Sequence, residues 1–189
     1  MVRVIMHGCN GRMGQVITEM IAKEAEMEIV AGVDVSDSVH NTYPVFKTLK
    51  DCDVEADVVI DFANAKAVDG LLDTCVAKSL PCVLCTTGLS EEQLAHVKEA
   101  SGKVAILRSA NMSMGINVLS ELCKRASAIL GVNYDVEIVE QHHHNKLDAP
   151  SGTALMLADA INGQNDGAYH YVYDRSSVRQ KRDPKEIGI

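Results

Sequence analysis

Short, almost entirely apolar runs alternate with helical patterns over the first 110 residues, and this alternation constrains the fold most strongly. We expect strands at residues 2–6, 28–34, 58–62, 81–86 and 104–107, and helices at residues 13–21, 65–78 and 90–100, where apolar residues recur at helical spacing. Segment 36–57 is assigned as loop with one short strand. Strands that are apolar on both faces are typical of a parallel sheet covered by helices. The sequence therefore predicts an α/β first domain with a parallel sheet.

The pattern changes after Ser113, where we place a domain boundary. Residues 114–130 have the spacing of one long amphipathic helix, residues 135–140 alternate as in a half-buried strand, and Ser151 is a candidate N-cap for another helix. Three tyrosines at alternating positions indicate a further strand, and the chain ends at Ile189 without an evident finishing element. We therefore expect an α+β second domain over residues 114–189, after a first domain over residues 1–113.

Composition and charge argue against several classes of function. The 189 residues are 47% hydrophobic and 23% charged, with a net charge of −8 that disfavours nonspecific binding to nucleic acid. No apolar run approaches the roughly 20 residues of a membrane helix. The six cysteines lack the spacing of a disulfide framework, so we expect reduced thiols in a cytoplasmic protein. Cys82 and Cys85 lie three apart in an expected strand, so their side chains point to opposite faces and do not indicate a metal site.

Three glycines follow the first expected strand and open the first expected helix: Gly8, Gly11 and Gly14, in the sequence GCNGRMG. In this context glycines permit a tight turn and let backbone amides approach a pyrophosphate at a helix N-terminus. The spacing GxxGxxG differs from the commoner GxGxxG, and an ordinary structural turn is the alternative. Together with the alternating strands and helices, the motif predicts a Rossmann-like domain that binds a nicotinamide dinucleotide.

Asp34 lies twenty residues after Gly14 at the end of the second expected strand, where a carboxylate can accept hydrogen bonds from an adenosine ribose. Such an acid repels a 2′-phosphate, and the next residue is Val35 rather than an arginine, so we expect NADH in preference to NADPH. Segments 85–87 and 109–112 lie at the carboxyl ends of expected strands, where open parallel sheets bind ligands, and are candidates for the nicotinamide site. Ordinary turn chemistry is the alternative for both segments.

A second run, EQHHHNKLDAPSGTA at residues 140–154, concentrates imidazoles, an ammonium group and an expected helix N-terminus. Three interpretations compete: a metal site, a solvated basic loop, or acid catalysis on an anionic substrate. Neighbouring histidines on an extended chain point to opposite sides, so His142 and His144 could converge but lack an evident third ligand. A solvated loop does not account for the neighbouring helix start. We therefore favour acid catalysis and expect no bound metal.

The residue types of this run fit such chemistry. Gly152 and Thr153 would present backbone amides at the helix start, which suits a carboxylate. Lys146 adds a positive charge with three donors and can balance charge that develops on the substrate. An imidazole such as that of His142 can pass a proton as a hydride arrives. The run therefore indicates reduction of a small carboxylated substrate.

The motifs GCNGRMG, DFANA, TTG, NMSMGIN and EQHHHNKLDAPSGTA together resemble the 4-hydroxy-tetrahydrodipicolinate reductase family, historically called dihydrodipicolinate reductases. The last motif is highly specific, and the likeness runs over nearly all of residues 1–175. The resemblance implies NAD(P)H-dependent reduction of 4-hydroxy-tetrahydrodipicolinate, a small dicarboxylate, to tetrahydrodipicolinate in lysine and diaminopimelate biosynthesis. It also implies a homo-oligomer.

The resemblance further implies a role for each matching residue. His142 is expected to be the catalytic acid or base and Lys146 the proton donor. The substrate-binding positions are expected to be His143, Gly152 and Thr153. The cofactor-binding positions are expected to be Gly8, Cys9, Asn10, Gly11, Arg12, Met13, Asp34, Cys85, Thr86, Thr87, Ser109, Ala110, Asn111 and Met112.

Two departures from the family pattern bear on function. Cys85 replaces a usual glycine before Thr86, so we expect a side chain near the nicotinamide path. Family members also continue for roughly sixty further residues, so we expect the second domain to be incomplete here. An NAD(H)-binding protein without turnover is therefore one alternative, and a dehydrogenase of another small amino or keto dicarboxylate is a second.

Overall fold

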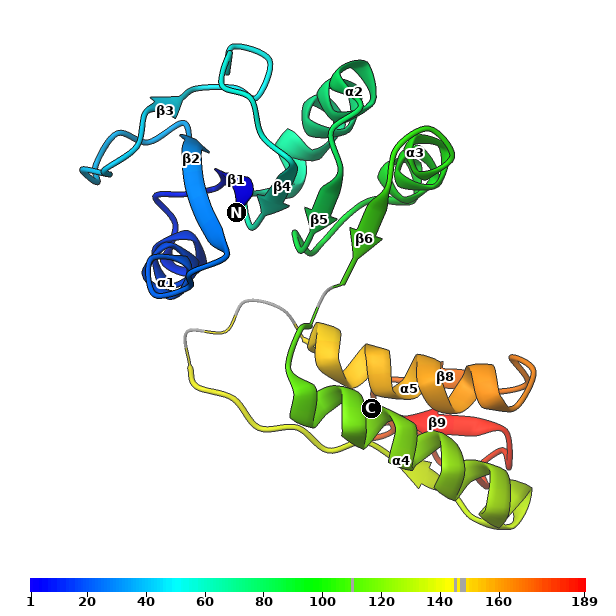
Figure 1. Ribbon diagram of the computed structural model, residues 1–189. Coiled ribbons are helices and arrows are strands. Elements are labelled where there is room, and N and C mark those ends of the chain that lie inside the picture. The colour runs from blue at the N-terminus through cyan, green and yellow to red at the C-terminus, as the bar shows by residue number, and fades with distance from the viewer. Residues whose placement is uncertain (110, 145, 147–148) are drawn as a thin grey trace. The chain divides into compact units, whose positions relative to one another are not determined.

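The structure is a computed structural model that describes residues 1–109, 111–144, 146 and 149–189. The chain divides between residues 110 and 111 into two compact units (Figure 1). The boundary expected after residue 113 lies three residues later in the chain. Each unit contains its own sheet, its own helices and its own buried apolar cluster.

The first unit is built on a parallel sheet of six strands, which confirms the expected α/β class. The strands are β1 (Val2–His7), β2 (Met27–Val33), β3 (Val45–Phe46), β4 (Val58–Asp61), β5 (Cys82–Leu84) and β6 (Ile106–Arg108). Their order across the sheet is β3-β2-β1-β4-β5-β6, and every neighbouring pair is parallel. The order reverses between β1 and β4, and open α/β sheets bind ligands at such a point. The short strand β3 is the one expected within the loop of residues 36–57.

Helices cover both faces of this sheet. They are α1 (Arg12–Ile21), α2 (Val68–Lys78), which follows a 3₁₀ turn at Ala65–Ala67, and α3 (Glu91–Ser101). Right-handed crossovers put α1 on one face and both α2 and α3 on the other, as Figure 1 shows. Buried residues from the strands and from α2 and α3, among them Ile5, Val59 and Leu72, form the core. The strands are apolar on both faces because both faces are covered.

One ionic contact joins α2 to α3 on the surface of the first unit. His96 Nδ1 lies 2.8 Å from Asp69 Oδ1, and its Nε2 lies 3.3 Å from Asp73 Oδ1. The hydrogen bond to Asp69 is the main cause that raises the pKa of His96 above its usual 6.5. The same bond is the main cause that lowers the pKa of Asp69 below its usual 3.8. The contact therefore stabilises the folded unit most between pH 3.8 and pH 6.5, where Asp69 is charged and His96 is protonated in the folded protein.

We expect the stability that His96 contributes to depend on pH in a defined direction. Because the folded pKa is raised, the contribution is fully present below pH 6.5 and is lost as pH rises through that raised pKa. The difference in free energy of unfolding between wild type and His96→Gln should therefore shrink from about pH 5.5 to about pH 9. Urea denaturation across this range measures it, with His40→Gln as the control at an exposed histidine. A difference that does not change with pH would contradict the contact.

The second unit contains two helices and a three-stranded sheet. Its elements are α4 (Met114–Leu130), a 3₁₀ turn at Gly131–Asn133, β7 (Val136–Glu137), α5 (Gly152–Gln164), β8 (His170–Val172) and β9 (Glu186–Gly188). The sheet order is β7-β9-β8, and both pairs are parallel. The apolar cluster joins Ala158 and Ile161 of α5 to Ile187 of β9, with Cys123 of α4 packed against it. The helices therefore cover one face of the sheet, and the expected α+β character is confirmed.

A strand that the sequence analysis did not expect lies close to Ile189. Strand β9 is the central strand of the second sheet, where Ile187 pairs with Val136 on one side and with Tyr171 on the other. Its three residues are all buried. The strand expected over residues 135–140 is shorter than predicted, because only β7 pairs with β9 before the chain turns away. Of the three alternating tyrosines, Tyr171 alone lies within β8.

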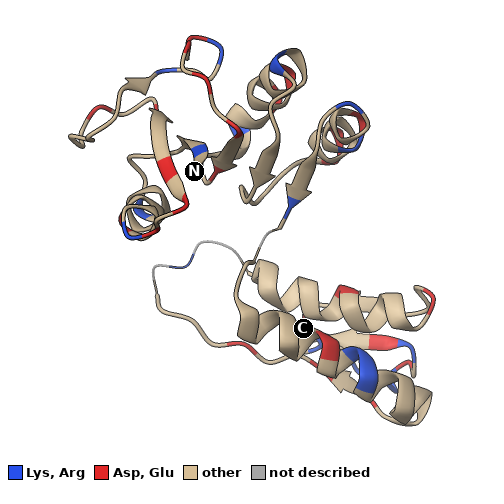
Figure 2. Ribbon diagram, viewed as in Figure 1, with Lys and Arg blue, Asp and Glu red and all other residues tan. Residues whose placement is uncertain are grey.

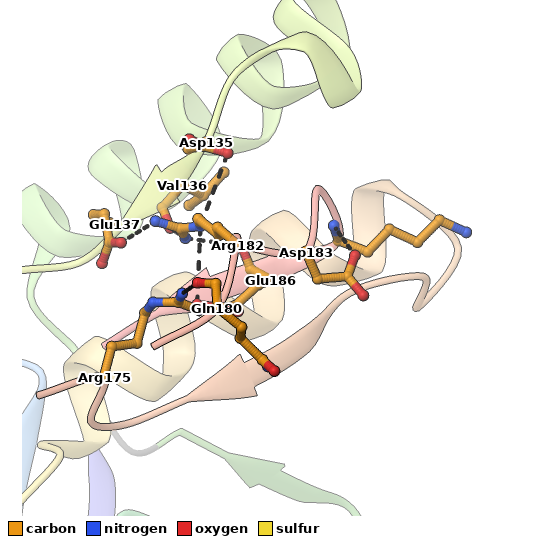
Figure 3. Close-up of polar contacts among 9 residues, drawn as sticks. Asp135, Val136, Glu137, Arg175, Gln180, Arg182, Asp183 and Glu186 are labelled. Atoms are coloured by element: carbon orange, nitrogen blue, oxygen red, sulfur yellow. Dashed lines mark hydrogen bonds and ion pairs between the residues drawn. The ribbon is translucent and has the colours of Figure 1, made fainter. Parts of the chain in front are cut away.

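Ion pairs cover the face of β9 that points away from the helices (Figure 3). Arg175 Nη1 donates at 2.6 Å to both carboxylate oxygens of Glu186, which is buried. Arg182 pairs with Glu137 and donates from Nη2 to the carbonyl oxygens of Val136 (2.7 Å) and Glu186 (3.0 Å). A buried carboxylate is tolerated only when it is paired and hydrogen-bonded. The basic segment before β9 therefore supplies the cations that let Glu186 occupy a central strand.

Charge elsewhere is mixed. Lys and Arg are interspersed with Asp and Glu over the loops and helix surfaces of both units (Figure 2). Among the described residues, no helix is both long enough and apolar enough to cross a membrane.

Candidate active site

The glycine turn forms a backbone cradle between β1 and α1. Gly8 has φ +81°, and a Cβ there would lie 2.7 Å from the carbonyl oxygen of Phe62. A Cβ on Gly14 would lie 2.2 Å from the carbonyl oxygen of Gly8. Gly11 is the N-cap of α1 and donates its amide to that same oxygen at 3.1 Å. Both contacts involve backbone, so the close approach of turn and helix requires glycine at positions 8 and 14.

Asn10 and Asp34 join this turn to the end of β2. The Asn10 amide donates to Asp34 Oδ2 at 2.9 Å, and the Ser36 amide donates to Asp34 Oδ1 at 2.8 Å. The carboxylate is thereby held beside the glycine turn, where the ribose of a dinucleotide would be expected. Arg12 and Met13 begin α1 with exposed side chains. The turn, the acid and the helix start thus have the geometry of a dinucleotide site, and these residues fit the cofactor.

The two cysteines named as cofactor positions point into the protein. Cys9 is fully buried, and its thiol lies against Gly32, where an added Cβ would be only 2.6 Å from the sulfur. Burial and then the charge of Asp34 raise the pKa of Cys9 to about 11. Cys85 is also buried, and burial followed by the charge of Asp61 raises its pKa to about 11. The thiols of both residues are therefore withdrawn from solvent.

A buried hydrogen-bonded pair lies at the point where the strand order reverses, and sequence reasoning missed it. His7 Nδ1 and Asp61 Oδ1 are 2.6 Å apart, at the last residues of β1 and β4, which are register partners. Asp61 is 0% exposed, and its Oδ2 has no hydrogen-bond partner within the described part of the chain. The available sequence signal for this pair was a polar residue at the end of each of two apolar strands that become neighbours in the sheet. The pair ties β1 to β4 directly beneath the glycine turn.

The remaining cofactor candidates of the first unit follow β5 and β6. Thr86 is buried, and its Oγ1 makes no hydrogen bond within the described residues, whereas Thr87 is exposed. Ser109 donates its amide to the carbonyl oxygen of Leu84 at 3.1 Å, which extends the pairing of β5 with β6. Thr86, Thr87 and Ser109 thus lie at the carboxyl edge of the sheet, as expected. Ala110 lies outside the described residues.

In the second unit, one cofactor candidate contacts one substrate candidate. Asn111 Nδ2 donates to Thr153 Oγ1 at 3.1 Å. The Asn111 carboxamide oxygen accepts from the Ser113 amide at 2.8 Å, just before α4 begins. Met112, between them, is half exposed. The start of α4 and the start of α5 are therefore linked through residues that the sequence assigned to different ligands.

The N-terminus of α5 has the form expected of an anion site. Ser151 is the N-cap and accepts the Ala154 amide on its Oγ at 3.1 Å. Gly152 and Thr153 occupy the first turn, where backbone amides have no partner within the helix, and a Cβ on Gly152 would meet open space. The Ser151 amide and hydroxyl both donate to the carboxylate of Glu140. Glu140 begins the basic run, and the sequence analysis gave it no role.

The catalytic candidates lie in the loop between β7 and α5. His142 Nδ1 is 3.9 Å from Glu140 Oε2, and the His142 side chain is 38% exposed. His143 is exposed and accepts the Lys146 amide on its carbonyl oxygen at 3.2 Å. The positive charges of His142 and Lys146 both contribute to lowering the pKa of Glu140, after the larger effect of its hydrogen bonds with Ser151. The structure therefore places His142 beside a carboxylate at the start of α5, and Lys146 lies in the same loop, close enough for its charge to act on that carboxylate.

The described part of the chain contains no group of three or more His, Cys, Asp or Glu side chains arranged to hold a metal ion. All six cysteines are free thiols.

Comparison with known protein families gives two matches that together span nearly the whole chain. The model of the dihydrodipicolinate reductase N-terminus matches residues 2–112, and the model of the C-terminus matches residues 115–189. The break between the matches lies close to the boundary between the two units.

Individual proteins agree with these matches. The 4-hydroxy-tetrahydrodipicolinate reductase of Caldanaerobacter subterraneus is 50% identical over 100% of this chain and 74% of that protein. The enzyme of the same name from Clostridium tetani is 46% identical with the same coverage. A solved structure of a dihydrodipicolinate reductase from Paenisporosarcina sp. TG-14, with dipicolinate bound, has 26% identity and a TM-score of 0.74 over 100% of this chain and 79% of that chain. On these matches, the chain belongs to the dihydrodipicolinate reductase family.

Proposed function

We propose that this chain reduces 4-hydroxy-tetrahydrodipicolinate to tetrahydrodipicolinate with a nicotinamide cofactor, in lysine and diaminopimelate biosynthesis. Membership of the family and the names of its relatives support this reaction. The observation that carries the proposal is the arrangement at the start of α5, where Glu140 contacts both Ser151 and His142. Through Glu140, this arrangement connects the imidazole of His142 to the first turn of α5, where Gly152 and Thr153 present their amides.

The proposed reaction consumes one hydride and one proton and releases one water from the hydroxylated substrate. When bound, the nicotinamide supplies the hydride. Lys146 donates the proton, and its charge balances the charge that develops on the substrate. His142 exchanges a proton as acid or base. His143 and the first-turn amides of Gly152 and Thr153 hold the substrate carboxylates.

Residues of the first unit would hold the dinucleotide. The amides of the turn from Gly8 to Met13 bind the pyrophosphate at the start of α1, because a helix N-terminus attracts anions. Asp34 accepts hydrogen bonds from the adenosine ribose. Thr86, Thr87 and Ser109 line the nicotinamide end. The glycine cradle, which a Cβ at position 8 or 14 would fill, supports this assignment.

A steady-state assay tests the proposed reaction directly. Substrate is generated freshly, and oxidation of NADH and of NADPH is followed, alongside a titration of cofactor binding without substrate. We expect turnover with at least one cofactor. Cofactor binding without turnover would instead support a nucleotide-binding protein that does not catalyse the reaction. Turnover of another small amino or keto dicarboxylate in preference would point to a related dehydrogenase.

We expect NADH to be preferred, because the Asp34 carboxylate repels a 2′-phosphate and Val35 offers no countercharge. Asp34→Asn removes that negative charge, so the ratio of kcat/KM for NADPH to that for NADH should rise about ten-fold. Asp37→Asn is the matched control, since Asp37 lies on the same loop with a nearly fully exposed side chain. A wild-type preference for NADPH by a wide margin would contradict the role given to Asp34.

We also propose a cytoplasmic location and a homo-oligomeric assembly. Six free cysteines are typical of a reducing compartment. Large apolar side chains are exposed on the second unit, among them Met114, Val118, Leu122 and Ile129 of α4, and contiguous exposed apolar surface is typical of protein–protein contact. Light scattering coupled to size-exclusion chromatography measures the assembly, and a strictly monomeric protein at assay concentrations would contradict it.

A further inference from the structure

Glu140 makes several connected polar contacts in the catalytic loop. Its Oε1 accepts the Ser151 amide at 2.8 Å, and its Oε2 accepts the Ser151 hydroxyl. The same Oε2 is 3.9 Å from His142 Nδ1. Ser151 in turn caps α5 by accepting the Ala154 amide. An electrostatic contact, longer than a hydrogen bond, therefore links the imidazole of His142 to Glu140, and two hydrogen bonds link Glu140 to the helix that presents Gly152 and Thr153.

Ser151 and His142 differ in how firmly they are held. Ser151 is 4% exposed and is the N-cap residue of α5, so packing within the second unit fixes its position. His142 lies in a loop without regular structure and has an exposed side chain. An exposed imidazole on a loop rotates freely unless a partner fixes it. Glu140, anchored twice on Ser151, is such a partner.

The charge of Glu140 suits this task. Hydrogen bonds from the Ser151 side chain and backbone lower the pKa of Glu140, and attraction to Lys146 and to a protonated His142 lowers it further. The group therefore remains an anion throughout the neutral range. A carboxylate that faces Nδ1 favours the proton on that nitrogen and leaves Nε2 to face a reacting group. Carboxylates that orient a functional histidine act in this way in other enzymes.

We propose that Glu140 is a positioning residue for the reaction, which orients the His142 imidazole and sets its tautomer relative to the helix start that holds the substrate carboxylates. The effect of Glu140 on the reaction rate rests on the proposed function. Its effect on the orientation and tautomer of His142 does not depend on turnover. The competing explanation is that Glu140 only stabilises the start of α5.

The deciding measurement is the tautomer of His142 in the protein without substrate. Long-range ¹H–¹⁵N NMR spectra distinguish the Nδ1–H form from the Nε2–H form, and the signals of His142 are assigned by their absence in His142→Gln. We expect the neutral imidazole of the wild type to be mainly Nδ1–H. In Glu140→Gln the population should move towards Nε2–H. A wild-type imidazole that is mainly Nε2–H overturns the proposal, and that outcome needs no variant to fold.

Kinetics provide the second test. Glu140→Gln should lower kcat about ten- to a hundred-fold, while KM for the substrate changes less than about three-fold, because misplacement of a proton-transfer group affects the chemical step. Glu140→Asp, which keeps the charge, should recover part of the loss. Glu121→Gln is the matched control, since Glu121 is an exposed, ion-paired glutamate of the same unit. It should leave both constants unchanged.

The outcomes separate this inference from the proposed function. A loss confined to KM and thermal stability, with an unchanged tautomer, overturns the positioning role and favours a purely structural one. Ser151→Ala gives the comparison, since it removes the α5 cap and the hydroxyl anchor of Glu140 while the Ser151 amide still holds the carboxylate. An inactive wild type contradicts the proposed function, and the NMR result then still decides whether Glu140 sets the tautomer of His142.

Discussion

Replacing Lys146 with Ala is expected to lower kcat about 10²- to 10⁴-fold, the range that a positioned proton donor contributes. The structure places the charge of Lys146 near Glu140, in the same loop as His142. Truncation removes both the proton donor and the cation that balances charge on the substrate. Binding of NADH should remain within about two-fold of wild type, because the dinucleotide residues of the glycine turn belong to the first unit.

Lys124→Ala is the matched control for this prediction. Lys124 lies on α4 of the same unit and pairs with Glu121 at 2.6 Å, so its loss changes the net charge equally without touching the catalytic loop. Stopped-flow and steady-state assays with both variants measure the effect. If Lys146→Ala retained kcat within about three-fold of wild type, another group would have to be the proton donor.

Replacing Gly14 with Ala is expected to destabilise the first unit by about 3 kcal/mol or more and to abolish dinucleotide binding. The added Cβ would lie 2.2 Å from the Gly8 carbonyl oxygen and 2.8 Å from both the Cα and the carbonyl carbon of Cys9. These are backbone atoms of the turn, so they cannot move aside as a flexible side chain would. Either α1 or the turn must shift, and both are needed to present amides to a pyrophosphate.

Gly70→Ala is the control for this effect. Gly70 lies within α2, and nothing lies within 4 Å of a Cβ built there. Alanine should stabilise that helix by about 0.5–1 kcal/mol, because glycine is the poorer helix former. Urea denaturation and quenching of NADH fluorescence compare the two variants. Equal unfolding midpoints for both would show that the turn and α1 do not pack as closely as described.

The first unit could be predicted largely from sequence because its signals are local. Each core strand is a short apolar run with a helical pattern after it, and right-handed crossovers leave few possible topologies. The chemistry of Gly8, Gly11 and Asp34 could be inferred because tight turns and strand ends restrict the residue types that fit. The pairing of His7 with Asp61 could not, since it depends on the register between β1 and β4.

The second unit was harder to predict because its key contacts are distant in sequence. Strand β9 has only three residues, too few to show a period, and its Glu186 looks solvent-exposed until Arg175 is placed beside it. The role of Glu140 was missed for a similar reason, since its partner Ser151 is eleven residues away across a loop. A glutamate two positions before a functional histidine was the available signal.

The position of β9 has a kinetic consequence for the second unit. Strand β8 pairs with β9 across a short loop, whereas β7, which among the described strands pairs with β9 alone, precedes it by about fifty residues. Closing so long a loop costs entropy that only the completed pairing repays. Contact between α4 and α5, which needs a shorter loop, should form earlier in folding. We therefore expect β7 to join the sheet last, after the helices have packed and β8 has paired with β9.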